Sequence, residues 1–453
     1  MPTQPTSKAT EDQLQPNAIG WVLLASLGVS YVIVGDYAGW NFGLAHGGWG
    51  GLAIATVYGA LMYAALLASF AELSIQIPEA GGGSAFAARA YGSVAACLAG
   101  ASILAEYVGA AAIIAIFMQA YVHATTGFGG PSLVIGVFAI FIGAHTMGVG
   151  GALRLLLVIA LIAVLGLLAF LAATAPHFDL TRLTDIPITT AWGAGKWLPH
   201  GWFGVWAALP FGTAFFLAVE GTALAAEETR DPARNIPRGM AAALGTLVLL
   251  AASLVLLAPG AAGSRELQAV NDPLVVALNA GGAHGAAPTL ALLVKICGAA
   301  AFLACLFSAM YGYSRLTFAL ARDGYLPKWL ARTNRRQAPV AAIVLPGIVA
   351  CGLALSNAAE QVFVLMVTAG TFSYLVILPA HWVLRVRGAR AGSTPATWRT
   401  PGGIFTSGFA WLTSAISFAA CFLSAPRWAT VTLIVLALIT VGYATRRRYR
   451  RSA

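Results

Sequence analysis

The chain has 453 residues, of which 59% are hydrophobic and only 9% are charged, and its formal net charge is +10. A globular domain carries about 25% charged residues because its surface faces water. This composition excludes a soluble enzyme and a disordered chain, and it predicts an integral membrane protein. The Lys and Arg residues lie in short loops between apolar runs, which is a pattern of membrane topology and not of a nucleic-acid-binding surface.

The five cysteines all fall inside apolar stretches, without the spacing of a disulfide framework or a metal site. We therefore expect buried thiols and no metal. Residues 1–18 are polar and lack the basic start and apolar core of a cleavable signal peptide. We expect them to form a cytoplasmic N-terminal tail, with the first apolar segment retained.

Twelve apolar segments are long enough to cross a bilayer as helices, since about 20 residues span about 30 Å. The sequence thus predicts an all-α membrane protein with twelve transmembrane helices. The first, second, third and sixth segments are long enough to tilt or to contain a break. The predicted spans are 19–45, 51–77, 93–124, 132–149, 153–175, 202–226, 239–258, 289–313, 338–356, 361–383, 405–423 and 429–444.

The basic residues predict the orientation of these spans. With the N-terminus in the cytoplasm, 21 of the 26 Lys and Arg residues lie inside and four lie outside, namely Arg182, Lys196, Arg265 and Arg427. Cytoplasmic loops carry such an excess of positive charge. We expect a multi-pass protein of the plasma (inner) membrane, surrounded by the lipid bilayer, with both termini in the cytoplasm and a basic tail at 445–453.

Charged residues at membrane depth mark the predicted site. A charge near the bilayer centre costs at least about 2.5–3.5 kcal/mol, so it normally faces a cavity or a partner. Asp36 and Glu220 each adjoin a glycine in the middle of a span, and their spans lie five helices apart. Glycine-interrupted helices at corresponding positions are typical of transporters with a midplane site. Glycines also allow close helix packing, but packing does not account for an adjacent buried acid twice.

Three further charges lie at membrane depth. Glu106 is about 13 residues into the third span, hence near mid-membrane, and we expect it to face the cavity. Glu72 lies near the cytoplasmic end of the second span, where a structural role is favoured. Lys295 lies about two turns inside the outer end of the eighth span, where snorkelling to the interface and a functional role stay equally open.

Three sequence blocks resemble the amino acid–polyamine–organocation (APC) transporters. They are AEL (71–73) with IPEAGG (77–82) and YG (91–92), Glu220 followed by AEETRDPARNIPR (226–238), and YSR (313–315) with ARDGYLP (321–327). The resemblance implies a LeuT-like transport core at 19–387, built from two inverted five-helix repeats, about 19–175 and 202–387. It also implies that helices one and six are unwound at the substrate, and that helices eleven and twelve, at 405–444, are additions to this core.

Within that superfamily, three segments resemble the ethanolamine permease group: GDYAGWNFG (35–43), EYV (106–108) and FFLAVEG (215–221). Relatives that carry amino acids typically hold the substrate carboxylate at a Gly-Ser/Thr-Gly break in helix one, where this chain has Val34-Gly35-Asp36. An ionised Asp36 would repel a carboxylate by about 4 kcal/mol at 4 Å and an effective dielectric near 20. The same Asp36 would attract an ammonium, so a small organic amine is the favoured substrate.

We therefore expect secondary active uptake of an amine, ethanolamine first, by alternating access. Asp36 is the predicted main countercharge and Glu106 a second acid, with unwound backbone at 34–37 and 216–221 contacting the substrate. Phe216 or Tyr107 is the predicted aromatic wall for a cation. The predicted substrate-binding residues are Val34, Gly35, Asp36, Tyr37, Glu106, Tyr107, Phe216, Val219, Glu220 and Gly221.

The candidates for coupling are Glu220, Ser308 and Lys295. Proton symport is preferred, because a buried carboxyl can change its protonation as a cavity opens and closes. A sodium site at the helix-one break and Ser308 comes second, because a lone serine in a membrane helix more often bonds its own backbone. An amino acid or polyamine permease, an exchanger and, more remotely, a channel or membrane-embedded enzyme stay open, although no catalytic motif indicates an enzyme. No cofactor is implied.

Overall fold

The computed structural model describes residues 19–79, 81–146, 152–280, 288–334, 338–390 and 398–452. The predicted N-terminal tail at 1–18 lies outside the described residues. Within these ranges the chain is built from helices, and an isolated parallel bridge joins Ile19 to Thr229. The all-α prediction is confirmed for the described residues.

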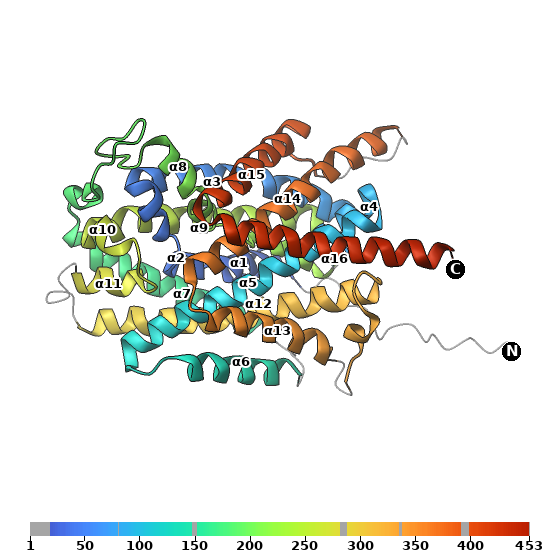
Figure 1. The fold of residues 1–453 in the computed structure, drawn as a ribbon, viewed down its shortest axis with the longest axis horizontal. Coiled ribbons are helices and arrows are strands. Elements are labelled where there is room, and N and C mark those ends of the chain that lie inside the picture. Colours follow the sequence, from blue (N-terminus) through green and yellow to red (C-terminus); the bar gives the residue numbers. More distant parts are fainter. Residues whose placement is uncertain are drawn as a thin grey trace.

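The α-helices are α1 (Trp21–Val32), α2 (Val34–Tyr37), α3 (Phe42–Gln76), α4 (Gly83–Tyr91), α5 (Ser93–Thr126), α6 (Pro131–Thr146), α7 (Ala152–Thr174), α8 (Gly201–Thr213), α9 (Pro232–Ala262), α10 (Ser264–Leu267), α11 (Pro273–Ala280), α12 (Pro288–Arg322), α13 (Val340–Leu355), α14 (Ala359–Arg390), α15 (Ile404–Ser424) and α16 (Pro426–Ser452). Short 3₁₀ helices connect them: η1 (Ala175–His177), η2 (Leu180–Thr184), η3 (Val219–Glu228) and η4 (Lys328–Ala331). Figure 1 shows the long helices running side by side along the longest axis of the molecule.

Eight of the described helices are long and apolar enough to cross a membrane: α3, α5, α7, α9, α12, α14, α15 and α16. Three shorter apolar helices, α1, α6 and α13, fall within the predicted spans 19–45, 132–149 and 338–356. The predicted span 202–226 is divided between α8 and η3. A multi-pass membrane protein is therefore supported, while the number of twelve crossings and the inverted repeat stay predictions.

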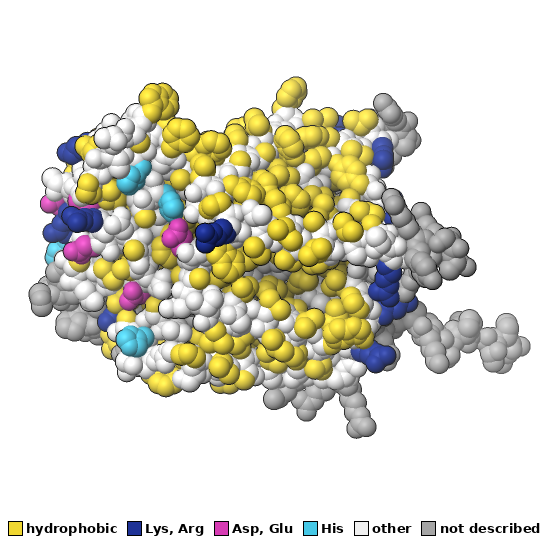
Figure 2. Space-filling view, viewed as in Figure 1, with side chains coloured by type: hydrophobic (Ala, Val, Ile, Leu, Met, Phe, Trp, Pro, Cys, Tyr) yellow, Lys and Arg dark blue, Asp and Glu magenta, His cyan; other side chains and the backbone are white. Residues whose placement is uncertain are grey.

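Segments predicted to lie on the same side of the membrane contact one another. On the predicted cytoplasmic side, Arg387 Nη1 donates to the carbonyl oxygen of Ala90 at 2.9 Å. On the predicted outer side, Ser264 Oγ donates to the carbonyl oxygen of Leu183 at 3.0 Å. In Figure 2 a broad hydrophobic band separates two charged ends, and Lys and Arg side chains gather at the right-hand end. This band is the surface that fits a bilayer.

The first helix break lies later in the chain than the sequence predicts. Val34–Tyr37 is the short helix α2, and extended backbone begins only at Ala38, with φ −161° and ψ 161°. The N–H of Ala38 donates to the carbonyl oxygen of Val34 at 3.1 Å and thereby closes a helical turn around Asp36. Gly39 follows with a φ of 98°, which a glycine adopts readily. The prediction of unwound backbone at 34–37 is therefore wrong by about one turn.

The second break lies where the sequence predicts it. Helix α8 ends at Thr213, and the chain resumes as the 3₁₀ helix η3 at Val219. Between them Ala218 has a φ of 76°, a left-handed conformation that costs a residue with a Cβ about 1–2 kcal/mol. The surrounding packing therefore holds this backbone in place.

Helices α3 and α8 pack closely along a seam of small residues. A Cβ placed on Gly212 would lie 2.4 Å from the carbonyl carbon of Ala55, and one on Gly47 would lie 2.9 Å from the carbonyl oxygen of Gly204. Small residues let backbones approach in this way in membrane proteins. The seam fixes the end of α8, and hence the second break, against α3.

We predict that Gly212→Ala destabilises the protein by about 1–3 kcal/mol, because its methyl group would press on the backbone of α3. The matched control is Gly245→Ala on α9, where a Cβ meets nothing within 4 Å. That change is expected to be neutral or to stabilise by about 0.5–1 kcal/mol. Thermal unfolding of the purified protein in detergent measures both, and equal melting temperatures for the two variants would contradict the close seam.

Candidate functional site

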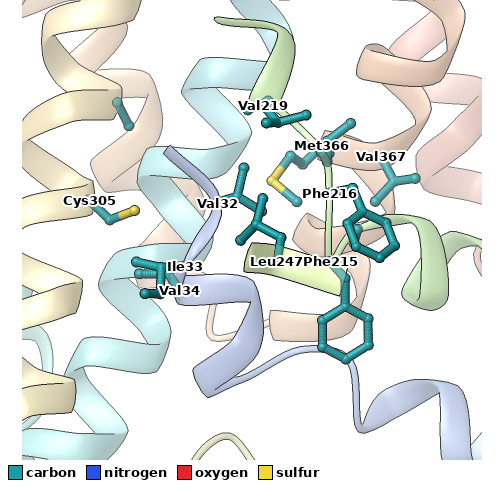
Figure 3. Packing of buried hydrophobic residues seen from close by; sticks show 14 of the residues in the cluster. Val32, Ile33, Val34, Phe215, Phe216, Val219, Leu247, Cys305, Met366 and Val367 are labelled. Atoms are coloured by element: carbon teal, nitrogen blue, oxygen red, sulfur yellow. The ribbon is translucent and has the colours of Figure 1, made fainter. Parts of the chain in front are cut away.

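A first cavity of about 50 Å³ lies between the two breaks. The two broken spans adjoin there, because a Cβ on Gly35 of α2 would lie 3.2 Å from the carbonyl oxygen of Ala214, just after α8. Figure 3 shows Val32 and Val34 of the first broken span, Phe215, Phe216 and Val219 of the second, and Met366 of α14. The wall is formed by Tyr31, Val32, Val34, Gly35 and Ala38, by Glu106, Ala110, Ile113, Ile114 and Phe117, by Ala214, Leu217 and Ala218, and by Phe363 and Met366.

Glu106 is the one charged side chain in this wall. It is 1% exposed, and neither of its carboxyl oxygens has a hydrogen-bonding partner in the part of the chain that the structure describes. Its carboxyl carbon lies 3.0 Å from the position of a Cβ on Gly370, so this glycine leaves the space that the carboxyl occupies. The prediction that Glu106 faces a cavity agrees with this geometry.

Asp36 is fully buried, and neither of its carboxyl oxygens has a hydrogen-bonding partner among the described residues. It is not among the residues that line the first cavity, although its neighbour Gly35 is. Two hydrogen bonds of Tyr37 hold helix α2 in place. The Tyr37 hydroxyl donates to the carbonyl oxygen of Ala163, and the Tyr37 carbonyl oxygen accepts from the hydroxyl of Tyr121, both at 2.8 Å. The structure therefore brings Val34, Gly35 and Glu106 together at the first cavity, and it leaves Asp36 buried outside that lining.

A second, smaller cavity of about 20 Å³ holds three of the other predicted site residues, Tyr107, Glu220 and Gly221. The carboxyl oxygen Oε2 of Glu220 has no hydrogen-bonding partner among the described residues. The remaining wall comes from segments that sequence reasoning did not connect with the site: Phe70, Gly82, Gly83, Ile103, Ala223, Leu224, Ser373, Tyr374 and Ile377. Gly82 and Gly83 lie at the start of α4, so this cavity lies toward the predicted cytoplasmic side.

Phe216 and Val219 are fully buried and line neither cavity. The ring of Phe216 packs instead against Tyr63 of α3, with ring centroids 5.9 Å apart. The aromatic side chains of the first cavity are Tyr31, Phe117 and Phe363. The sequence did not indicate these three residues, because an aromatic residue that lines a cavity has the same apolar surroundings in the sequence as one in the core.

Four phenylalanines from four helices close the predicted outer side of the first cavity. They are Phe42, Phe117, Phe211 and Phe363, and the rings of Phe211 and Phe363 stack with centroids 5.6 Å apart. Beyond them, His46 Nε2 lies 2.7 Å from Glu360 Oε1, and the His46 ring stacks on Phe211. This contact joins the start of α3 to the start of α14.

Two of the predicted coupling residues have local partners. Ser308 Oγ donates to the carbonyl oxygen of Ala304 at 3.0 Å, one turn earlier in α12. Beside it, the Cys305 thiol donates to the carbonyl oxygen of Ser30 at 2.8 Å. Lys295 is half-buried at the predicted outer end of α12, close to Asp272. Burial raises the pKa of Asp272, and the charge of Lys295 opposes that rise.

Comparisons with known proteins agree with this architecture. The sequence profile of the amino acid permease family matches residues 22–422. The chain belongs to the amino acid permease family. It is 31% identical to an uncharacterised transporter of Rhizobium meliloti, over 77% of this chain and 75% of that protein. It is also 26% identical to the methylthioribose transporter of Bacillus subtilis, over 72% of this chain and 70% of that protein. It is 24% identical to the branched-chain amino acid permease BcaP of the same organism, over 63% of this chain and 62% of that protein. The protein is a transporter and not an enzyme.

Glu72, in contrast to the other buried acids of this permease, is fully partnered. Its Oε2 accepts from the backbone N–H of Thr400 at 2.7 Å, and it lies 3.0 Å from His381 Nε2 and 3.6 Å from Arg385 Nη1. The group connects α3, α14 and the segment before α15. This geometry agrees with the structural role predicted for Glu72.

We predict that Glu72→Ala lowers the free energy of unfolding by about 3–5 kcal/mol, because it leaves the buried His381 and the N–H of Thr400 without their acceptor. The control is Glu79→Ala, which removes an exposed carboxyl and should change stability by no more than about 0.5 kcal/mol. Thermal unfolding in detergent compares the two. A melting temperature of the Glu72→Ala protein equal to that of the wild type would contradict the structural role.

Proposed function

We propose that this permease is a secondary active transporter that takes up a small organic amine, with ethanolamine as the first candidate, by proton symport and alternating access. The observation that carries the proposal is Glu106, a buried and unpartnered acid in the wall of the cavity between the two helix breaks. No Lys, Arg or His is among the residues of that wall. Such a cavity attracts an ammonium and repels a carboxylate.

The backbone of the first break supports the same choice. A carboxylate would need free N–H groups there, but those of Asp36 in α2 and of Ala38 and Gly39 in the break already donate to other groups of the protein. The size of the cavity also favours a small solute. At about 10–15 Å³ for each water-sized group, 50 Å³ holds about four such groups, which matches the four non-hydrogen atoms of ethanolamine.

In this conformation Glu106 is the acid that lines the first cavity, so we propose that it is the main countercharge for the substrate ammonium. Asp36 is the second proposed countercharge, since it lies one residue beyond Gly35 and no described residue forms a hydrogen bond with its carboxyl that would compete with a substrate. A small rearrangement of α2 would bring its carboxyl into the cavity. Tyr31, Phe117 and Phe363 supply the aromatic faces that favour a cation.

Proton coupling is supported over sodium by the surroundings of the first break. Ser308, the predicted sodium ligand, bonds its own helix, and the Cys305 thiol already donates to the carbonyl oxygen of Ser30 near the end of α1. The carboxyls of Glu106 and Glu220 are better placed to take up a coupling ion, because each has an unpartnered oxygen facing a cavity.

An amino acid is the second candidate substrate, because the family and the Bacillus subtilis relative BcaP are named for amino acid transport. A zwitterion would place its ammonium on Glu106 and would need a separate partner for its carboxylate. The two candidates therefore differ in their response to a carboxylate on the ligand.

We predict that ethanolamine raises the melting temperature of the purified permease, because a ligand that binds only the folded state stabilises it. Glycine and ethylene glycol, which add a carboxylate or lack the ammonium, should give no shift. Glu106→Gln should weaken ethanolamine binding by about tenfold or more, the loss expected for a charge-assisted hydrogen bond. Asp36→Asn should also weaken ethanolamine binding. The control variant Glu266→Gln, which changes an exposed acid on the predicted outer side, should leave the binding unchanged.

The panel of ligands also separates the two candidate substrates. A shift with branched-chain amino acids and none with ethanolamine would contradict the amine proposal and support an amino acid permease. Unchanged ethanolamine affinity in both Glu106→Gln and Asp36→Asn would show that neither acid is the countercharge.

A further inference from the structure

Glu106 and Glu220 line different cavities but lie near the same three tyrosines, Tyr63, Tyr107 and Tyr374. Glu106 lines the first cavity and Glu220 the second, and their carboxyls are close enough for the charge of one to act on the other. Glu106 and Leu217 both approach Gly370, and the hydroxyl of Tyr107, the neighbour of Glu106, lies 2.8 Å from the position of a Cβ on Gly221, the neighbour of Glu220. The pair therefore spans the distance between the two cavities.

No positively charged side chain balances this pair in the described part of the chain. The titratable groups that face it are tyrosines, one each from α1, α3, α5 and α14: Tyr31, Tyr63, Tyr107 and Tyr374. Two neighbouring carboxyls in a buried site cannot both be ionised without a cation. The pair must hold a proton, a bound cation or both.

We propose that Glu106 and Glu220 form one two-charge site, in which the ammonium of the substrate is held by Glu106 while a proton is held by Glu220. This inference rests on the proposed amine transport. With both positive charges present the site is neutral, whereas either one alone leaves a buried negative charge, which is costly in a membrane. The arrangement predicts one proton carried with each amine.

The second cavity is the place where this proton is exchanged with the cytoplasm. Its 20 Å³ has room for one or two water molecules, at about 10–15 Å³ for each. A water there would find the polar partners that it needs in Glu220 Oε2, the hydroxyls of Tyr107 and Tyr374, and Ser373. In the release step the O–H bond of Glu220 breaks, the proton passes to the water oxygen, and the carboxylate keeps the electron pair.

Two transport assays on one set of proteoliposomes separate the roles of the two acids. Counterflow of radiolabelled ethanolamine measures exchange through the substrate cavity, and accumulation driven by an inward proton gradient measures coupling. Glu220→Gln, which mimics a permanently protonated acid, should lower gradient-driven accumulation by about tenfold or more but counterflow by no more than about threefold. Glu106→Gln should lower both assays together, and the exposed Glu266→Gln should change neither.

A substitution in the lining of the second cavity tests the role of the proposed water and leaves both carboxyl groups unchanged. Ala223→Val places two methyl groups in the cavity, so it should slow gradient-driven accumulation more than counterflow. Because a buried change can unfold the protein, its melting temperature is measured beside Gly245→Ala. In addition, wild-type liposomes with a trapped pH indicator should report one proton for each amine.

The outcomes distinguish this inference from the proposal on which it rests. No counterflow of any amine by the wild type would contradict amine transport, and with it the two-charge site. Amine counterflow by the wild type together with undiminished gradient-driven accumulation in Glu220→Gln would contradict the two-charge site alone. Equal loss of both assays in a stably folded Glu220→Gln protein would show that Glu220 binds substrate and does not carry the proton.

Discussion

A carboxyl group inside a bilayer needs a hydrogen-bonding partner, a cation or a proton, and the buried acids of this permease meet that need in two different ways. Glu72 receives its partners from three segments of the protein itself, and it therefore ties α3 to α14 and to the start of α15. Asp36, Glu106 and Glu220 each keep at least one carboxyl oxygen without a hydrogen-bonding partner among the residues that the structure describes. A fold that can satisfy one buried acid so completely leaves the other three open at the helix breaks, where a solute and a proton can complete them.

The helix breaks also leave backbone N–H and C=O groups in need of hydrogen-bonding partners, and nearby residues of the protein supply these partners. In the first break the N–H of Gly39 donates to the side chain of Asn41, whose own amide donates to the carbonyl oxygens of Leu267 and Val270 in the outer segment. In the second break the chain tightens into the 3₁₀ helix η3. Irregular backbone at membrane depth is tolerated where protein surrounds it or where it lines a cavity. The small-residue seam between α3 and α8 supplies that protein surrounding.

The sequence was sufficient to predict the membrane class, the positions of the long helices and the family, because these depend on composition, on runs of apolar residues and on local motifs. It also indicated which acids lie at membrane depth. It did not predict that α2 closes one more turn, because the bond from Ala38 to Val34 depends on how Tyr37 is held by α5 and α7. Nor did it predict that the site divides into two cavities, since the second cavity, which includes Glu220 but not Glu106, is lined by segments distant in the sequence, including α4 and α14. Side-chain direction on a broken helix is a tertiary property, which the spacing of charges does not determine.

The two ends of the site are closed by different kinds of contact, and this difference bears on the transport cycle that we propose. At the predicted outer end, four phenylalanines in contact with one another and the His46–Glu360 pair join α3, α5, α8 and α14. Opening that end would expose large aromatic surfaces, so solute or lipid contacts would have to offset the loss of packing. Toward the predicted cytoplasmic side lies the second cavity, whose lining includes Tyr107 and Glu220 together with Gly82 and Gly83 at the start of α4. The cycle that we propose therefore requires the aromatic contacts at the predicted outer end to separate when the permease opens outward, and it places Glu106 and Glu220 on the path toward the predicted cytoplasmic side.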